Sequence, residues 1–220
     1  MKKTFIFYFL SLILINQAAP LRGTENSFSE EESFLVGRLK KQDKRYPTFL
    51  LALQLLKELK AKTLVETGTA RNGDQNFWGD GGSTIIFADW ASKNNALLHS
   101  VDISPLAIQY AKAASAPYKD NIQFTVGDSI TFLKNFNKPI DFLYLDSFDF
   151  ELDNPFPSQN HHLKELIAAY SKLHDKTVIM IDDCDLPHGG KGKLAIEFLT
   201  KKGWIVLHSG YQVILVSNKF

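Results

Sequence analysis

Five apolar stretches of this sequence end in acidic residues, and carboxylates in that position can bind a cation or accept hydrogen bonds from a ligand. These acidic residues are Glu66, Asp102, Asp128, Asp146 and the pair Asp182–Asp183. If the stretches are neighbouring parallel strands, their carboxyl ends lie along one edge of a sheet, where ligands bind. Carboxylates crowded there repel one another unless donors or a cation are present. Each one could instead cap the helix that follows its strand.

The stretch Thr63–Ala70 carries the first of these strand ends, and a glycine turn follows it. Gly68 comes two residues after Glu66, and a second pair, Gly81–Gly82, precedes Ser83 at the start of an apolar helical pattern. A glycine turn before a helix N-terminus lets the backbone approach a ligand closely. The dinucleotide pattern G-x-G-x-x-G and the phosphate-loop pattern with Gly-Lys-Ser/Thr are both absent, which makes a dehydrogenase the weaker alternative.

Hydrophobic periodicity and turn residues predict strands that alternate with helices. Strands are expected at 63–66, 97–101, 122–126, 140–145 and 178–181, followed by a hairpin of 204–207 and 211–216. Helices are expected at 30–41, 47–59, 83–92, 161–173 and 191–202. Two more helices are expected, one that begins at 104–105 and one that follows 127–129 and ends at about 136. This order predicts an α/β fold with a three-layer, Rossmann-like, doubly wound sheet, mostly parallel with an antiparallel C-terminal hairpin strand. The long polar loop 67–82 is a candidate functional loop.

The N-terminal segment 1–22 is set apart from the predicted fold. Lys2–Lys3 precede the uncharged run Thr4–Ile15, and this order is typical of a secretory signal peptide. The run is shorter than the ~20 residues of a membrane span. We therefore expect a signal peptide or membrane tether at 1–22, a helical cap at 23–60 and the main domain at 61–220. Export or membrane tethering is the expected localisation; a buried N-terminal helix in a cytoplasmic protein is the alternative.

The composition fits one globular domain without a preferred macromolecular partner. The 220 residues are 45% hydrophobic and carry a formal net charge of +1, with no basic stripe that would favour nucleic acid. The single cysteine, Cys184, excludes an internal disulfide framework and argues against a cysteine zinc site. No nucleic-acid partner is expected, and the oligomeric state is left open.

Four short motifs in this order resemble the class I S-adenosylmethionine-dependent methyltransferases. They are LVETGT at 64–69, SVDIS at 100–104, VGDS at 126–129 and DFLYLD at 141–146, and the terminal hairpin also matches that fold. The resemblance covers about residues 60–218, so the main domain is expected to be methyltransferase-like.

The resemblance implies a role for each strand end in holding S-adenosylmethionine. Glu66 and Gly68 hold the amino-acid part, with Ser83 nearby and with Thr67 and Thr69 in the same turn. Asp102, followed by Ile103, binds the two ribose hydroxyls, for which a carboxylate is a bidentate acceptor. Asp128 accepts a hydrogen bond from the adenine amine, with Ser129 beside it, and Asp146 lies next to the methyl-bearing sulfur.

Within this class, the last strand ends look like those of the catechol-type, metal-dependent small-molecule O-methyltransferases. In that group, an aspartate like Asp146 and an acidic pair like Asp182–Asp183 hold a divalent cation, for which Mg²⁺ is the hard-ligand choice. The alternative is that Asp182 and Asp183 cap a loop and pair with Lys191 or Lys193. Two features depart from the group: Asp149 stands where it has a lysine, and the glycine loop carries extra residues at about 72–80.

His161 and His162 open a predicted helix shortly after Asp146, so either imidazole is a candidate general base beside that carboxylate. A solvent-exposed helix start is the alternative. The predicted function is therefore methyl transfer to an oxygen of a small-molecule acceptor, assisted by a metal. A metal-independent class I methyltransferase and a non-catalytic exported domain of the same fold are the alternatives.

Overall fold

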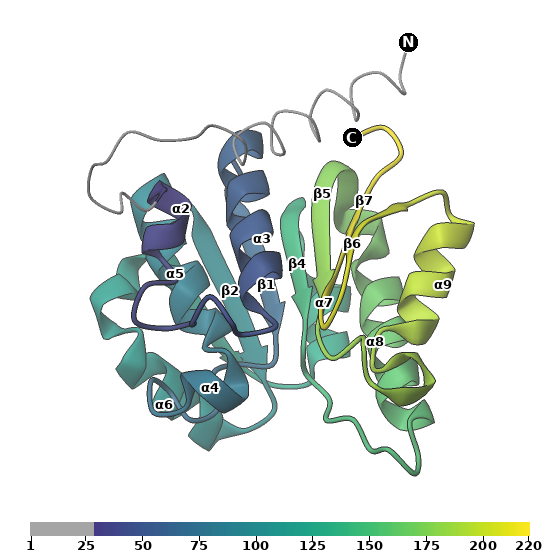
Figure 1. Ribbon diagram of the computed structural model, residues 1–220, viewed down its shortest axis with the longest axis horizontal. Coiled ribbons are helices and arrows are strands. Elements are labelled where there is room, and N and C mark those ends of the chain that lie inside the picture. Colours follow the sequence, from purple (N-terminus) through teal and green to yellow (C-terminus); the bar gives the residue numbers. More distant parts are fainter. Residues whose placement is uncertain (1–28) are drawn as a thin grey trace.

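The computed structural model describes residues 29–220, and its centre is one seven-stranded sheet (Figure 1). The strands are β1 (Thr63–Thr67), β2 (Leu97–Asp102), β3 (Ile122–Val126), β4 (Ile140–Leu145), β5 (Leu173–Ile181), β6 (Ile205–Ser209) and β7 (Val213–Val216). Their order is β3-β2-β1-β4-β5-β7-β6. The first five strands are parallel, and β7 pairs antiparallel with both β5 and β6. The predicted fold class is confirmed.

Helices cover both faces of the sheet. They are α2 (Glu30–Ser33), α3 (Tyr46–Leu59), α4 (Phe77–Asp80), α5 (Ser83–Asn94), α6 (Pro105–Ala114), α7 (Ser129–Asn135), α8 (Phe156–Ala169) and α9 (Lys193–Lys201). In Figure 1, α5 and α6 lie to one side of the strands, whereas α8 and α9 lie to the other.

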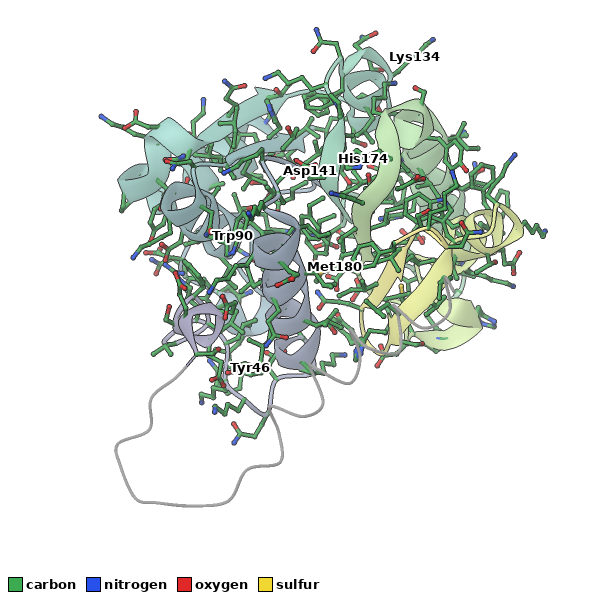
Figure 2. The ribbon with its side chains drawn as sticks, turned by 90° about the horizontal axis from the view of Figure 1, so that it is seen from above. Tyr46, Trp90, Lys134, Asp141, His174 and Met180 are labelled. Carbon is green, nitrogen blue, oxygen red and sulfur yellow. The ribbon has the colours of Figure 1, made fainter. Side chains whose placement is uncertain are left out.

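Two hydrophobic cores form because successive side chains of a strand point to opposite faces. Leu64 of β1 packs in the core that contains α3 and α5, whereas the next residue, Val65, packs in the core of α7, α8 and α9. Trp90 and Met180 belong to the first core and lie beside α3 in Figure 2. Since α3 shares this core with the sheet, the N-terminal helical region is part of the layered structure.

Three predicted boundaries and one predicted loop differ from the structure. The helix expected at 30–41 has the Ser29–Glu32 capping box but ends at Ser33. Turns follow it, and Gly37, with a φ of +77°, prevents a regular helix from running on to residue 41. The helix expected from His161 begins five residues earlier, at Phe156, next to Pro157. Strand β5 begins at Leu173, where that helix was expected to end, and the loop 67–82 contains the short helix α4.

The predicted signal peptide or tether at 1–22 lies outside the described residues. Within 29–220, none of the helices combines the length and the apolar character that crossing a membrane requires.

Candidate functional site

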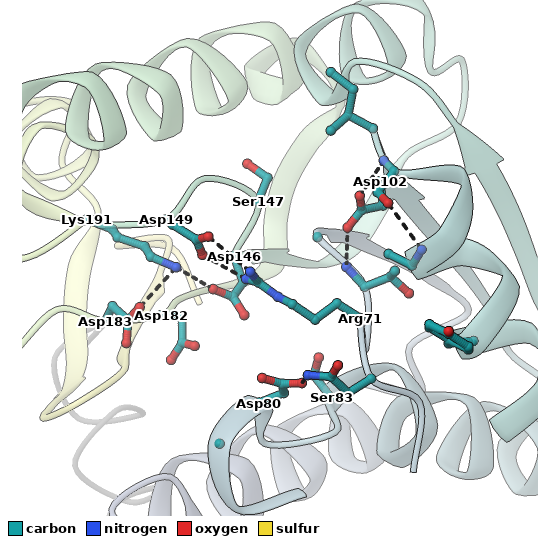
Figure 3. A pocket seen from close by; sticks show the side chains of 18 of the residues that line it. Arg71, Asp80, Ser83, Asp102, Asp146, Ser147, Asp149, Asp182, Asp183 and Lys191 are labelled. Atoms are coloured by element: carbon teal, nitrogen blue, oxygen red, sulfur yellow. Dashed lines mark hydrogen bonds and ion pairs between the residues drawn. The ribbon is translucent and has the colours of Figure 1, made fainter. Parts of the chain in front are cut away.

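A cavity of about 640 Å³ opens at the carboxyl ends of the parallel strands (Figure 3). Its walls come from the turns after β1, β2, β4 and β5, from the loop and helix α4 at 71–80, and from the first turns of α5 and α6. Asp102 lies at one end, and the group Asp146, Asp182, Asp183 and Lys191 lies at the other. Four of the five predicted acidic strand ends therefore meet near one cavity, and three of them line it.

The turn after β1 needs glycine. Gly68 has a φ of +81°, and a Cβ there would overlap the backbone carbonyl oxygen of Asp146 on the neighbouring strand end. The Gly68 amide donates to the carbonyl of Val101 in β2 at 2.9 Å. Gly68 thus joins the ends of β2 and β4 and keeps a backbone surface open to the cavity, with Thr69 next to it.

Glu66 is fully buried behind this turn and does not line the cavity. Its carboxylate accepts hydrogen bonds from the hydroxyls of Ser83, Thr84 (2.7 Å) and Ser100 (2.8 Å). Burial raises the pKa of Glu66 to about 7, although the three hydroxyls act in the opposite direction. The adjacent Thr67 is also fully buried. Of the residues predicted for the amino-acid part of the cofactor, Gly68, Thr69 and Ser83 face the cavity, whereas Glu66 and Thr67 support it from beneath.

Asp102 presents a fixed carboxylate to the cavity. It accepts a hydrogen bond from the Thr69 amide at 3.1 Å and one from the Ser104 amide at 2.7 Å. The two bonds use different oxygens, so each oxygen keeps a lone pair for a ligand. Ile103 follows with its side chain 75% exposed and also lines the cavity. Asp102 and Ile103 therefore both line the cavity, as the sequence predicted for residues of one binding site.

Asp128 and Ser129 are not brought to this cavity. Asp128 is the N-cap of α7 and accepts a hydrogen bond from the Thr131 amide at 2.8 Å, which lowers its pKa together with the Thr131 hydroxyl. It lines a separate shallow depression beside His99. Ser129 is buried, with its hydroxyl 3.1 Å from His161 Nε2. The capping alternative describes the geometry of Asp128 in this structure.

Neither predicted histidine lines the cavity. His162 is fully buried, its Nδ1 lies 2.7 Å from the carbonyl oxygen of Ser158, and burial lowers its pKa. His161 lies against Ser129 and 3.4 Å from the carboxylate of Glu165. Both sit in the second turn of α8, because the helix begins at Phe156. Neither imidazole therefore lines the cavity that Asp146 lines.

The three carboxylates predicted to hold a metal do converge. One oxygen atom of each of Asp146, Asp182 and Asp183 lies within 4.8 Å of the others. The ammonium group of Lys191 is already among them, 2.7 Å from Asp146 Oδ1 and 3.0 Å from Asp183 Oδ2. Two of the three potential ligands therefore carry an ion pair, and the donor set does not fit a divalent cation while Lys191 keeps this position.

The electrostatics of this cluster follow from burial and from Lys191. Burial raises the pKa of Asp182 well above its usual value, and Asp146 and Asp183 raise it further. Burial would also raise the pKa of Asp183, but Lys191, a hydrogen bond with Tyr211 and the charge of Arg45 together outweigh burial and lower that pKa. Burial would lower the pKa of Lys191, yet the surrounding carboxylates raise it. Lys191 is therefore a positively charged group inside the protein.

Sequence reasoning did not identify two cationic side chains and a tyrosine near this cavity. Arg45 is 8% exposed and donates to the Gly79 carbonyl at 2.8 Å and to the Tyr211 hydroxyl at 3.2 Å. Arg71 forms a two-bond ion pair with Asp149, at 2.7 and 3.0 Å. Arg45 and Tyr211 are 166 positions apart in the sequence, so no local pattern predicts their contact. The opposite charges of Arg71 and Asp149 could have predicted their ion pair.

The comparisons with known proteins agree with this architecture. A sequence model of a family described as a methyltransferase domain matches residues 78–184, just under half of the chain. No curated protein sequence matches the chain.

Several solved structures share the fold. An O-methyltransferase from Bacillus cereus in complex with SAH is 17% identical, over 84% of this chain and 87% of that one, with a TM-score of 0.56. The SAH-bound methyltransferase PaMTH1 from Podospora anserina is 13% identical, over 89% and 99%, with a TM-score of 0.57. NSun6 from Pyrococcus horikoshii with SFG is 13% identical, over 89% and 57%, with a TM-score of 0.61. The chain therefore has the Rossmann-like fold of the methyltransferases, and its residues 78–184 match a methyltransferase domain.

Proposed function

We propose that this protein is an S-adenosylmethionine-dependent methyltransferase that acts on a hydroxyl oxygen of a small molecule. The observation that carries the proposal is the cavity itself, which joins the fixed Asp102 carboxylate to the Gly68 turn and to Asp146 along one sheet edge. The neighbours solved with SAH, a product form of this cofactor, support the same ligand here.

The residues at the Asp102 end fit the nucleoside part of the cofactor. Each oxygen of Asp102 has a backbone donor and a remaining lone pair, so the carboxylate is oriented before two ribose hydroxyls bind. Ile103 offers an exposed apolar side chain for the face of a base. Gly68 and Thr69 offer backbone to the amino-acid part, because a side chain at Gly68 would close the turn.

When bound, the cofactor supplies a methyl group on a positively charged sulfur. In the proposed transfer, the acceptor oxygen would form the new carbon–oxygen bond, the electron pair of the broken carbon–sulfur bond would stay on sulfur, and the hydroxyl proton would pass to solvent. At the acceptor end, Asp182 Oδ1 is buried and has no hydrogen-bond partner among residues 29–220. An acceptor hydroxyl that donates to this oxygen would be oriented beside Asp146, and it would satisfy a buried acceptor atom that otherwise costs free energy.

The shape and charge of the cavity favour a small acceptor. The Arg71–Asp149 ion pair links the loop after β1 to the loop after β4 across the cavity wall. The cavity lining mixes acidic and basic side chains instead of presenting a basic surface, and the net charge is only +1. The ammonium of Lys191 at the acceptor end favours the metal-independent alternative.

Calorimetric titration of S-adenosylmethionine into the full chain tests the proposal. Binding is expected with a dissociation constant on the order of 1–100 µM, the range of ordinary enzyme–substrate affinities. Asp102→Ala should weaken it by about 1.5–3 kcal/mol, the scale for hydrogen bonds to a charged group. Asp120→Ala is the matched control, because Asp120 is exposed and does not line the cavity.

Absence of binding to the folded wild-type chain would contradict the proposed activity and favour the non-catalytic alternative. Equal affinities for wild type and a folded Asp102→Ala variant would remove Asp102 from the cofactor site.

We also propose that residues 1–22 direct export of the protein or its tethering to a membrane. Sequencing the N-terminus of the mature protein from fractionated cells tests this. An intact N-terminus in the soluble cell fraction would contradict it.

A further inference from the structure

Lys191 is an unusually placed lysine. Its side chain is 2% exposed, whereas lysines are almost never fully buried unless they are paired. Its ammonium contacts Asp146 on one strand end and Asp183 on the next, and Asp182 adds to the field that holds its charge. Burying a charged amine is unfavourable unless such partners offset the loss of hydration. The three carboxylates are therefore what allows this lysine to be inside the protein.

The chain that leads to Lys191 is built to hold it in place. The Lys191 amide donates to the carbonyl oxygen of Asp183 at 3.0 Å, which closes the intervening segment into a loop. Asp183 and His188 both have positive φ, and Gly190 has a φ of +55°. A Cβ at Gly190 would overlap the carbonyl oxygen of Asp183.

A second support comes from α8. The buried side-chain amide of Gln159 donates to the carbonyl oxygens of both His188 and Gly190, at 3.1 Å each. Positive φ at non-glycine residues persists only where the surrounding structure determines it. The loop is thus held from both ends and from one side, and the position of Lys191 is a fixed feature of the fold.

We infer that Lys191 is a built-in cation that occupies the place of a divalent ion, so the Asp146–Asp182–Asp183 cluster does not bind a metal in the native protein. An ion at this point would have to displace the ammonium of Lys191 from Asp146 and Asp183, since this ammonium already forms an ion pair with each of these carboxylates. It would also meet the positive charge of Arg45, which acts on the same Asp182 and Asp183 carboxylates. Both effects oppose a second cation.

The catalytic consequence rests on the proposed function. If methyl transfer occurs here, Lys191 supplies the positive charge beside Asp146 that lowers the cost of an anionic acceptor oxygen. Lys191 then supplies, at the acceptor end of the cavity, the positive charge that a bound metal ion would otherwise supply. The occupancy of the cluster by Lys191 does not depend on that activity and can be measured without any cofactor.

Paramagnetic resonance of Mn²⁺ added to the full chain tests the inference, because bound Mn²⁺ loses the sharp signal of the free ion. The wild-type protein is expected to leave that signal unchanged. Lys191→Met removes the charge at similar volume and should create a Mn²⁺ site that the wild type lacks, so that the apparent affinity rises at least about tenfold above any residual binding by the wild type. Asp183→Asn added to Lys191→Met should remove the site again. Lys193→Met, an exposed lysine two residues away, is the matched control and should behave as wild type.

Mn²⁺ binding by the wild type that disappears in Asp183→Asn would overturn the inference, and this test does not require the Lys191 variant to fold. A folded Lys191→Met protein that binds no Mn²⁺ would also overturn it, because Lys191 would then not be what excludes the ion. Failure of the proposed function is seen separately, as loss of S-adenosylmethionine binding with the Mn²⁺ results unchanged.

Discussion

Glu66 is a carboxylic acid enclosed at the end of β1, and its replacement by glutamine should change how stability depends on pH. The side chain is fully buried, and its two oxygens meet only the hydroxyls of Ser83, Thr84 and Ser100 among the described contacts. Burial raises its pKa from 4.5 to about 7. Glutamine keeps the shape and cannot ionise, so the variant removes the titration while the neighbouring hydroxyls can reorient to bind the amide.

The direction of the effect follows from proton binding. Between pH 4.5 and about 7, the unfolded chain has lost the Glu66 proton, whereas the folded chain retains it. The folded state therefore binds more protons, and the free energy of unfolding falls as pH rises across this window. A pKa difference of this size corresponds to about 3 kcal/mol. Below pH 4.5 the penalty is absent, and above pH 7 it is present in full.

Urea unfolding of wild type and Glu66→Gln from pH 4 to pH 8 measures the contribution of Glu66 to the pH dependence of stability. The free energy of unfolding of the variant minus that of wild type should rise by about 3 kcal/mol over the range, because the other titrating groups cancel in the difference. Altered hydrogen bonding in the variant adds a constant offset, so the slope is the quantity of interest. Glu197→Gln, the same change on the exposed face of α9, shows the effect of the substitution at the surface.

A difference that does not vary with pH would refute the reasoning, because the hydroxyls would then offset the burial completely. A difference that falls as pH rises would mean that they stabilise the carboxylate beyond its value in water. Either result would change the interpretation of Glu66 from a neutral support of the Gly68 turn into a charged one.

Two further predictions concern the loops at the cavity. Gly68→Ala should destabilise the protein by at least about 2 kcal/mol more than Gly37→Ala in thermal or urea unfolding; both glycines have positive φ, but only at Gly68 does a Cβ meet a carbonyl. Similar losses for the two variants would mean that the contact with Asp146 relaxes. Arg71→Met should change the free energy of unfolding by less than about 1 kcal/mol, because Arg71 and Asp149 are 49% and 69% exposed in their side chains. A larger loss would show that this pair holds the two loops together.

The sheet could be predicted because its central strands are recognisable from local sequence patterns. The central strands β1, β2 and β4 are short, largely buried apolar runs that end in polar turns, as expected for strands covered on both faces. The capping box at Ser29 could also be predicted, but the helix that it opens ends at Ser33, and the positive φ of Gly37 prevents a helix from running on to residue 41. Whether a glycine continues or ends a helix depends on the tertiary structure around it, which local propensity does not contain.

The positions of individual side chains were harder to predict. Aspartate after a strand can face a ligand, as Asp102 does, or cap the next helix, as Asp128 does, and the sequence pattern is the same in both cases. His161 and His162 were placed at a helix start, although Pro157 marked an earlier one. One and a half turns of displacement are enough to move an imidazole from the sheet edge into the core.

The acidic edge of the sheet shows how these carboxylates coexist without a common counter-ion. Glu66 is surrounded by hydroxyls and has a raised pKa, Asp102 accepts from two backbone amides, and Asp146 and Asp183 share Lys191. The repulsion expected from the sequence is thus resolved separately at each strand end, by whichever donor the local fold provides. Asp182 alone among these five keeps a buried oxygen without a partner in the described chain, and it lies beside the fixed charge of Lys191. The edge therefore leaves a buried oxygen without a hydrogen-bond partner at the place where the proposed acceptor hydroxyl would bind. A divalent ion is not needed to explain why so many carboxylates are there.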